Sequence, residues 1–401
     1  MLFYEGRWKN MRLDFVSEEE KDQIKGLMKY CFLIDDDTLD WIGEEVFEAK
    51  NCLGVYEDER IVASLQVLPF EIFFNGNPVQ MGGINAVCTL PEHRSKHYAG
   101  DLLERALKLM RERNQIFSML APFSYDFYRK YGWELAFQAR KYEFNVRSFK
   151  KYKETENVRL EALDFDDIPE VKTVYENYIR KYNGALKRSE KDWNIKFKGH
   201  EKDDKYRYGC IDEDGVLQGY IFFKIKDRKI NIDEFCYNSI KSKKSLFSFI
   251  YSHRSQVKKV QWKAPDDDNT ILMLNEPDRS HKFEIGMMIR IVDVEEVLKR
   301  IEVKEKVSRV SFAMRVLDSY ASWNDKIFNI RIENGELEIE ILDNDIDADI
   351  VCPIQTLSQL ISGYAKLEEL YELGEIKGDA DKVDYLSYLI SDGTTFMNDH
   401  F

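Results

Sequence analysis

The sequence has few cysteines and few histidines, and those it has are scattered. Six cysteines and six histidines occur in 401 residues, with no C-x-x-C pair and no histidine at the spacing of metal ligands. These absences exclude zinc-binding and thioredoxin-like motifs, and we expect no metal. In so long a chain, isolated cysteines are typical of free, mostly buried thiols in a reducing compartment, which predicts a cytoplasmic protein.

Long apolar stretches are also missing. No uncharged apolar run approaches the roughly 18–20 residues that a helix needs to cross a bilayer, so a transmembrane protein is excluded. The N-terminus has no apolar stretch of the length found in signal peptides. We therefore expect no membrane partner.

Lysine and arginine are fewer than aspartate and glutamate, and the difference is concentrated in one part of the chain. The net charge is −14, which argues against a nucleic-acid partner because phosphate contacts need clustered Lys and Arg. From Gly286 to Phe401, 24 Asp and Glu face 12 Lys and Arg, a net charge of −12 that leaves only −2 for residues 1–285. This change in net charge along the chain predicts a domain boundary near residue 285.

Apolar residues, by contrast, are plentiful enough for two or three domains. They make up 44% of the chain and aromatic residues 13%, which excludes a disordered protein. Residues 11–147 read as β, α, α, β, β, β, α, β, α, β, and residues 157–284 repeat this pattern more loosely. Residues 285–401 read as strands followed by helices, beginning with a strand at 287–291, which is typical of an α+β domain.

The most informative segment covers residues 82–103. A strand runs into Pro91, a turn carries the basic side chains of His93, Arg94 and Lys96, and an amphipathic helix follows at once. The N-terminus of a helix has unpaired N–H groups and a positive dipole end, so it can hold phosphate. The segment therefore predicts an anion site, although an ordinary strand–turn–helix with surface bases remains an alternative.

A second segment, residues 122–133, follows a buried strand and is rich in tyrosine. A short helix here would bring one of Tyr125, Tyr128 and Tyr131 close to the proposed phosphate site. A phenol with a pKa of about 10 can donate a proton to a departing thiolate if it is held nearby. Each tyrosine, taken alone, has packing as its alternative role.

Together the two segments resemble the GNAT superfamily of N-acetyltransferases. Residues 94–99 (RSKHYA) are similar to the superfamily's R/Q-x-x-G-x-G/A acetyl-CoA loop, and residues 127–133 (FYRKYGW) are similar to its Tyr-x-x-x-Gly-Phe/Trp run. The chain length, the Pro-Glu-His-Arg turn and residues 286–298 further resemble the enhanced intracellular survival family. That family includes enzymes that acetylate several amines of aminoglycosides and some that acetylate lysine side chains.

The resemblance implies a fold of mixed α/β and α+β class with three domains. Residues 1–150 would form an acetyltransferase domain with the acetyl-CoA site, and residues 151–284 a second acetyltransferase-like domain without one. Residues 285–401 would form a sterol-carrier-protein-like domain that supplies the C-terminal carboxylate. The resemblance also implies a homohexamer.

Site residues carried over from the resemblance fall into two groups. Tyr128 would be the general acid, and the C-terminal carboxylate of Phe401 would be the general base in the cleft of the first domain. The acetyl-CoA contacts would come from the strand, turn and helix of residues 82–103 and from the tyrosine-rich segment, namely Val87, Cys88, Thr89, Ser95, Lys96, His97, Tyr98, Ala99, Gly100, Phe123 and Ser124.

His97 departs from the pattern, because the superfamily has glycine at this place in the loop. Glycine lets the backbone approach the pyrophosphate and adopt a positive φ. His97 could weaken acetyl-CoA binding, turn its ring outward, or reach a phosphate itself.

The acceptor is the least constrained part of the prediction. A polycationic acceptor needs local carboxylates, and Asp35 and Asp36, shortly before Trp41, are the candidates in the first domain. The alternative is that Asp36 or Asp37 only caps the next helix. Two other functions stay open: a protein or peptide lysine N-acetyltransferase, and a non-catalytic lipid-binding protein with a decayed acetyl-CoA loop.

Overall fold

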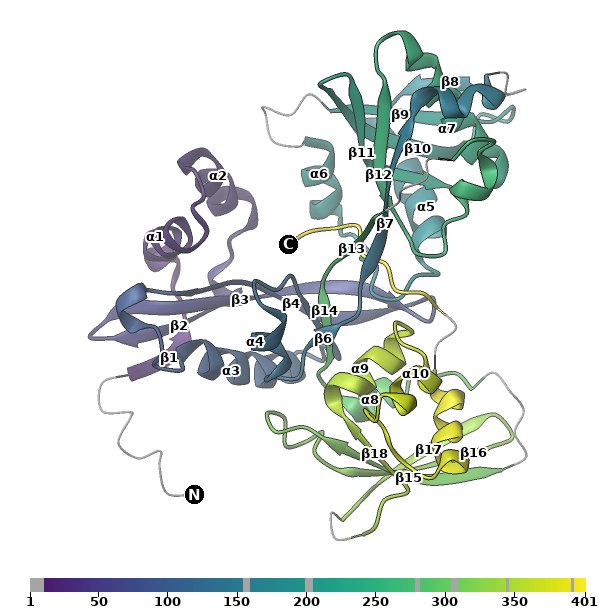
Figure 1. Ribbon diagram of the computed structural model, residues 1–401. Coiled ribbons are helices and arrows are strands. Elements are labelled where there is room, and N and C mark those ends of the chain that lie inside the picture. Colours follow the sequence, from purple (N-terminus) through teal and green to yellow (C-terminus); the bar gives the residue numbers. More distant parts are fainter. Residues whose placement is uncertain are drawn as a thin grey trace.

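The computed structural model describes residues 11–153, 159–198, 205–277, 282–303, 309–343, 346–390 and 393–401. The first ten residues of the predicted first domain lie outside these ranges. The described chain forms three β-sheets with helices packed on them, and in Figure 1 the second sheet lies at the top, the first in the middle and the third at the bottom. No helix in the described ranges is long and apolar enough to cross a membrane.

The first sheet contains a parallel pair, β4 and β5, among antiparallel neighbours. In spatial order its strands are β1 (Met11–Phe15), β2 (Cys52–Glu57), β3 (Arg60–Phe74), β4 (Asn77–Thr89), β5 (Phe117–Leu120), β14 (Met288–Ile291) and β6 (Glu134–Leu135). β4 pairs with β5 only along residues 81–83, whereas β4 itself continues to Thr89. Pairing between the two strands therefore ends at Gly83, and the place where they separate is here named the V-shaped gap.

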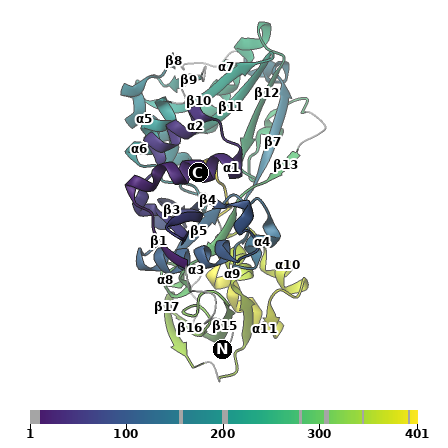
Figure 2. The ribbon, with the colours of Figure 1, turned by 90° about the vertical axis from the view of Figure 1, so that its left-hand side faces the viewer.

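Helices cover both faces of the first sheet (Figures 1 and 2). α1 (Lys21–Phe32) and α2 (Asp36–Trp41) lie on one face, here named the α1 face, while α3 (Tyr98–Glu112) and α4 (Tyr125–Arg129) lie toward the other. The predicted apolar stripe of α3 is buried, which confirms its helical spacing: Leu102, Leu103, Ala106, Leu107 and Met110.

The second sheet repeats this design. In spatial order its strands are β13 (Lys282–Ile285), β7 (Gln138–Asn145), β12 (Lys259–Ala264), β11 (Lys229–Tyr237), β10 (Leu217–Lys226), β9 (Tyr206–Ile211) and β8 (Arg159–Ala162). α5 (Ile168–Ile179), α6 (Glu190–Lys198) and α7 (Ile240–Ser252) belong to the same unit. Its parallel pair, β11 and β12, is in register over only three residues, 229–231 with 259–261, and then diverges like β4 and β5.

The third sheet has five strands and carries the most acidic surface. In spatial order the strands are β17 (Glu336–Leu342), β16 (Ile327–Glu333), β15 (Val310–Leu317), β18 (Ile350–Pro353) and β19 (Lys377–Gly378). The helices of this region are α8 (Val294–Leu298), α9 (Ile354–Ser362), α10 (Leu367–Glu372) and α11 (Ala380–Val383). The edge strand β17 leaves its glutamates exposed.

Two strands leave the unit to which sequence order assigns them. β7, expected at the end of the first domain, pairs with β12 and β13 in the second sheet. β14, expected to open the third domain, lies in the first sheet between β5 and β6. All four residues of β14 are buried, as expected for a strand in the interior of a sheet that is covered on both faces.

An ion pair ties β14 to the third domain. Arg290, fully buried, donates both to the Asp318 carboxylate, at 2.8 and 2.6 Å, and to the backbone carbonyl of Tyr131. Arg290 therefore links the segment after α4 to the segment that follows β15. The predicted domain limits at residues 150 and 284 remain predictions. Near each limit a strand joins the sheet of the other domain: β7 lies in the second sheet and β14 in the first.

Candidate functional site

The gap between β4 and β5 leaves one backbone edge of β4 open. Beyond Gly83 this edge has no partner strand in the described part of the chain, so the backbone groups of residues 84–89 that point toward β5 are left without strand pairing. A β-bulge in β4 between Asn85 and Cys88, where Ala86 has a φ of 49°, interrupts the regular pairing with β3. An open strand edge can bind an extended molecule through main-chain hydrogen bonds.

The residues expected to contact the pantetheine arm, Val87, Cys88 and Thr89, lie on this open edge. The Cys88 side chain is buried, and burial raises the pKa of its thiol, so it stays protonated at neutral pH. A protonated, buried thiol is a poor nucleophile, which disfavours a covalent intermediate on Cys88. The described residues contain no cluster of three or more His, Cys, Asp or Glu side chains able to hold a metal ion.

The loop before α3 has the backbone conformation that glycine usually supplies. His97 caps α3 with a φ of 72°, and Ser95 has a φ of 63°. A Cβ atom at Gly100 would lie 2.4 Å from the His97 ring and 2.5 Å from the Tyr131 hydroxyl oxygen. The His97 ring therefore packs against the first turn of α3, whose N-terminus offers N–H groups to an anion.

Glu57, at the end of β2, fixes this loop and was not found from the sequence. It accepts a hydrogen bond from the Tyr98 hydroxyl and from Lys96 Nζ, the latter at 2.9 Å. The hydrogen bonds from Tyr98 and then Lys96 lower the pKa of Glu57 to about 2, so it is ionised at neutral pH. Lys96 thus sits beside the loop as a partnered cation, and a bound phosphate would compete with Glu57 for it.

The loop geometry predicts how substitutions of His97 behave. We expect His97→Gly to leave KM for acetyl-CoA within about threefold, because glycine adopts the observed φ without strain. His97→Val should raise KM for acetyl-CoA about tenfold or more, since a β-branched residue strongly disfavours a positive φ. Steady-state kinetics of the two variants measures the difference, and equal KM values would show that the backbone of His97 does not shape the site.

Tyr128 lies in α4 with its side chain almost fully buried. Ser124 caps this short helix by accepting a hydrogen bond from the Phe127 N–H at 3.3 Å, and the exposed Phe123 ring packs 5.4 Å from the Tyr128 ring. Burial, and then the neighbouring Cys88, raise the pKa of Tyr128. The phenol therefore remains protonated at neutral and mildly alkaline pH, as a proton donor must.

The structure distinguishes Tyr128 from the two other candidate tyrosines. The Tyr125 hydroxyl donates to the Gly286 carbonyl at 2.9 Å, and the Tyr131 hydroxyl lies 3.4 Å from His97 Nε2. The Tyr128 hydroxyl has no hydrogen-bond partner in the described ranges. It is thus the phenol of the three whose proton is uncommitted.

Phe401, the C-terminal residue, lies against the first sheet. Its ring centroid is 4.8 Å from that of Phe70 on β3, and a Cβ atom at Gly83 would lie 2.7 Å from the Phe401 ring. Gly82 faces Met110 of α3, so Gly83, its neighbour in the strand, faces the α1 face. The chain end therefore reaches the first sheet where β4 and β5 begin to separate, and Figure 2 shows it on the same side of the sheet as α1.

Gln66 shares this region and was missed in the sequence. It lies on β3 four residues before Phe70, which places both side chains on the same face, and it pairs with Asn85 of the bulge. Gln66 is 2% exposed, and neither its amide nitrogen nor its amide oxygen has a hydrogen-bond partner in the described structure. A buried, unsatisfied amide is costly, which marks a place for a polar ligand group. The only signal in the sequence is a glutamine inside an apolar strand.

The predicted acceptor carboxylates have structural tasks. Asp35, and not Asp36 or Asp37, caps α2 by accepting a hydrogen bond from the Thr38 N–H at 2.9 Å. Asp36 pairs with Lys29 of α1. Trp41 is half-buried at the end of α2, so these residues lie on the α1 face without forming a compact acidic pocket.

Three family models match consecutive parts of the chain. Residues 12–136 and residues 184–291 each match an acetyltransferase (GNAT) domain, and residues 294–398 match a sterol carrier protein domain. The V-shaped gap, the loop and the family matches define the protein as an N-acetyltransferase of the GNAT superfamily, with acetyl-CoA as co-substrate.

Solved structures share the whole arrangement. A probable N-acyltransferase of Enterococcus faecalis V583, described as a conserved protein of unknown function, has 24% identity and a TM-score of 0.87, covering 98% of this chain and 99% of its own. A GCN5-related N-acetyltransferase from Anabaena variabilis has 23% identity and a TM-score of 0.86, with 98% and 100% coverage. Eis1 from Mycobacterium abscessus has 16% identity and a TM-score of 0.78, with 98% and 100% coverage.

The chain therefore consists of two GNAT acetyltransferase domains followed by a sterol carrier protein domain, which confirms the predicted fold class. At these identities the likeness to solved structures concerns the fold alone. A search of curated proteins gives no match.

Proposed function

We propose that this protein transfers an acetyl group from acetyl-CoA to an amine of a polycationic small molecule such as an aminoglycoside. The observation that supports this proposal most is the position of Phe401, whose ring packs on Gly83 and Phe70 at the opening between β4 and β5. A chain end at this place brings a carboxylate to the mouth of the acetyl-CoA gap. Acetyl-CoA supplies the activated acetyl group.

The residues present fit acetyl-CoA. The open edge of β4 at residues 87–89 suits the amides of the pantetheine arm, and the loop from Ser95 to Gly100 at the N-terminus of α3 suits the pyrophosphate. Phe123 is exposed and Ser124 follows it at the start of α4, beside Tyr128. These are the residues to which we assign cofactor binding.

The chain's own groups then divide the proton transfers. An amine with a pKa of about 8–10 must lose a proton before it can attack, and the Phe401 carboxylate takes that proton, directly or through water. Backbone N–H groups of β4 near Val87 are the donors available to polarise a carbonyl in the gap. Tyr128 donates its phenolic proton to the departing thiolate, which its raised pKa and uncommitted hydroxyl allow.

The acceptor must be recognised by local groups, since the first 285 residues carry a net charge of only −2. The Phe401 carboxylate supplies one negative charge, and Gln66 offers an unsatisfied amide on the same face of β3 as Phe70. Asp35, Asp36 and Trp41 are weaker candidates for contacting the acceptor. The Asp35 carboxylate caps α2, and the Asp36 carboxylate forms an ion pair with Lys29. An acceptor that carries both amines and hydroxyls matches these groups, because an amine can pair with the Phe401 carboxylate and a hydroxyl can form a hydrogen bond with the Gln66 amide.

The two alternatives are separable. A lysine side chain of a protein could use the same proton-transfer groups, so only acceptor kinetics distinguishes it. A lipid-binding role for the third domain does not explain why the chain end packs on the first sheet. The buried side chains of the third sheet and its helices pack against one another in one continuous apolar cluster.

A panel of amines tests the proposal. We expect thiol release from acetyl-CoA, followed with a thiol reagent, to be at least about tenfold faster (in kcat/KM) with an aminoglycoside than with a lysine-containing peptide, since about 1.4 kcal/mol of differential binding suffices. Faster thiol release with the peptide would contradict the polycationic small molecule as acceptor and favour a lysine side chain of a protein or peptide. The absence of thiol release with every amine would contradict the proposed activity itself. The homohexamer and the cytoplasmic location remain predictions, the first testable by light scattering in solution.

A further inference from the structure

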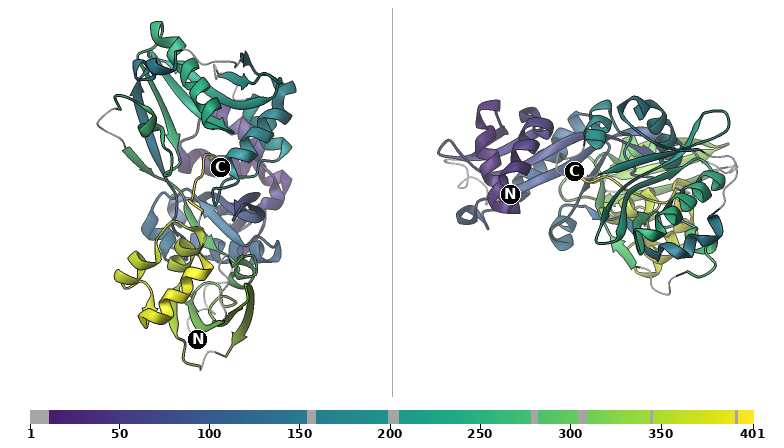
Figure 3. Two further views of the ribbon diagram at one scale, coloured as in Figure 1. Left: turned by 90° about the vertical axis from the view of Figure 1, so that its right-hand side faces the viewer. Right: turned by 90° about the horizontal axis from the view of Figure 1, so that it is seen from above.

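The second acetyltransferase domain has a parallel strand pair that separates like that of the first, and the C-terminal tail lies along the opening. β11 and β12 diverge after three paired residues. Along the diverging strands, Phe235, Cys236 and Trp262 line one depression together with two tail residues, Phe396 and Asn398. Figure 3 shows the tail, in yellow, passing between the second domain and the first, with its end near the centre of the molecule.

The tail is held there by its backbone and by an aromatic anchor. The Asn183 N–H donates to the Thr394 carbonyl at 3.0 Å, and the Phe396 N–H donates to the Asn183 carbonyl at 3.2 Å. The Phe396 side chain is buried against Tyr182, with the ring centroids 5.5 Å apart. The tail is therefore held by one parallel β-bridge, between Asn183 and Thr395, and by the buried ring of Phe396.

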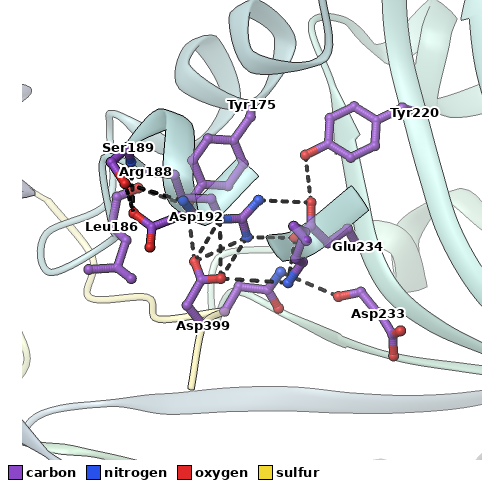
Figure 4. A network of polar contacts seen from close by, with 11 residues as sticks. Tyr175, Leu186, Arg188, Ser189, Asp192, Tyr220, Asp233, Glu234 and Asp399 are labelled. Atoms are coloured by element: carbon purple, nitrogen blue, oxygen red, sulfur yellow. Dashed lines mark hydrogen bonds and ion pairs between the residues drawn. The ribbon is translucent and has the colours of Figure 1, made fainter. Parts of the chain in front are cut away.

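Beyond Phe396, a buried charge cluster holds Asp399 (Figure 4). Arg188 donates to both carboxylate oxygens of Asp399, at 2.8 to 3.1 Å, and to the Glu234 carboxylate at 2.5 and 3.1 Å. Lys196 lies 2.7 Å from Glu234 and 3.5 Å from Asp399. The Tyr220 hydroxyl donates to Glu234 at 2.7 Å.

The charges of this cluster balance only when the tail is present. Burial opposes the ionisation of Glu234, but Arg188 and Lys196 outweigh it and keep its pKa below the ordinary value. Among the described residues of the second domain, Glu234 is the carboxylate that pairs with these two cations, and Asp399 of the tail is the second carboxylate of the cluster. Arg188 and Glu234 are both buried, and a buried charge without a partner is costly. The second domain thus presents a preformed receptor for an anion on the tail.

We propose that the second domain has become a receptor for the chain's own C-terminus, with Arg188 acting through Asp399 as a positioning residue for the Phe401 carboxylate. Asp399 and Phe401 are two residues apart, a span of at most about 7 Å, so fixing Asp399 confines the carboxylate to the mouth of the first gap. This inference rests on the proposed role of Phe401 as general base.

The substitution Asp399→Asn tests the receptor, because it keeps the side-chain shape and removes the charge. Carboxypeptidase A, which removes C-terminal phenylalanine, reports on the tail directly. We expect the release of Phe401, followed by mass spectrometry on the full-length protein, to be about tenfold faster or more than in the wild type, because a less tightly held segment opens more often. We also expect kcat to fall about tenfold while KM for acetyl-CoA is unchanged, since the loop before α3 is untouched.

Tyr220→Phe is the matched control. It removes a hydrogen bond from the same buried cluster but contacts Glu234 and not the tail. We expect wild-type release of Phe401 and wild-type kcat, with both variants keeping a single cooperative thermal transition.

The outcomes separate this inference from the proposed function. Wild-type release of Phe401 in Asp399→Asn, or equally accelerated release in Tyr220→Phe, would overturn the receptor. Faster release of Phe401 in Asp399→Asn with unchanged kcat would support the second domain as a receptor for the tail and would contradict Phe401 as the general base.

Discussion

Deletion of Phe401 is expected to lower kcat by about 10²-fold or more while KM for acetyl-CoA stays within about threefold, because the deletion removes the general base and leaves the cofactor loop intact. The new C-terminal carboxylate, on His400, would lie one residue back along the tail. A full residue spans about 3.5 Å, which is enough to take the carboxylate out of reach of the amine. Initial rates of thiol release measure the effect.

Two further variants separate the carboxylate from the aromatic ring. Adding one alanine after Phe401 keeps the ring that packs on Phe70 and Gly83 but moves the carboxylate, and should lower kcat as much as the deletion. Phe401→Leu keeps the carboxylate and most of the apolar contact, and should retain kcat within about threefold. A fully active extended chain would exclude the carboxylate from catalysis.

Tyr128→Phe is expected to lower kcat by about 10²-fold, because the departing thiolate loses its proton donor. The ring stays, so the packing with Phe123 and the buried position are preserved. Tyr125→Phe is the matched control, since it removes a phenol from the same helix whose hydroxyl is committed to the Gly286 carbonyl. Comparable losses of kcat in the two variants would point to a structural effect on α4 and against a general acid.

Local signals predicted the scaffold of the site well. Asn75 and Gly76 have φ values of 50° and 75° and join β3 to β4 in a two-residue hairpin, as the Asn-Gly pair predicts. The apolar stripe of α3 was equally clear because a helix buried on one face repeats its apolar residues every three to four positions. Tyr128 was one of three candidates until hydrogen bonding distinguished them.

Features that depend on distant segments could not be predicted. The exchange of β7 and β14 between sheets depends on which edges remain unpaired after the rest of the chain folds. The sequence around Arg188 shows only a basic residue before a helix, whereas its partners Glu234 and Asp399 lie 46 and 211 positions away. From the sequence, the second domain was therefore predicted only to be acetyltransferase-like and without an acetyl-CoA site, and its contacts with the tail became visible only in three dimensions.

We expect the chain to bind acetyl-CoA at one site, in the first domain, because the tail lies in the equivalent opening of the second domain. Isothermal titration calorimetry of the wild-type protein with acetyl-CoA tests this most directly. We expect one molecule of acetyl-CoA to bind per chain. Two molecules per chain would contradict the filled second gap, and no binding would contradict the acetyltransferase site itself.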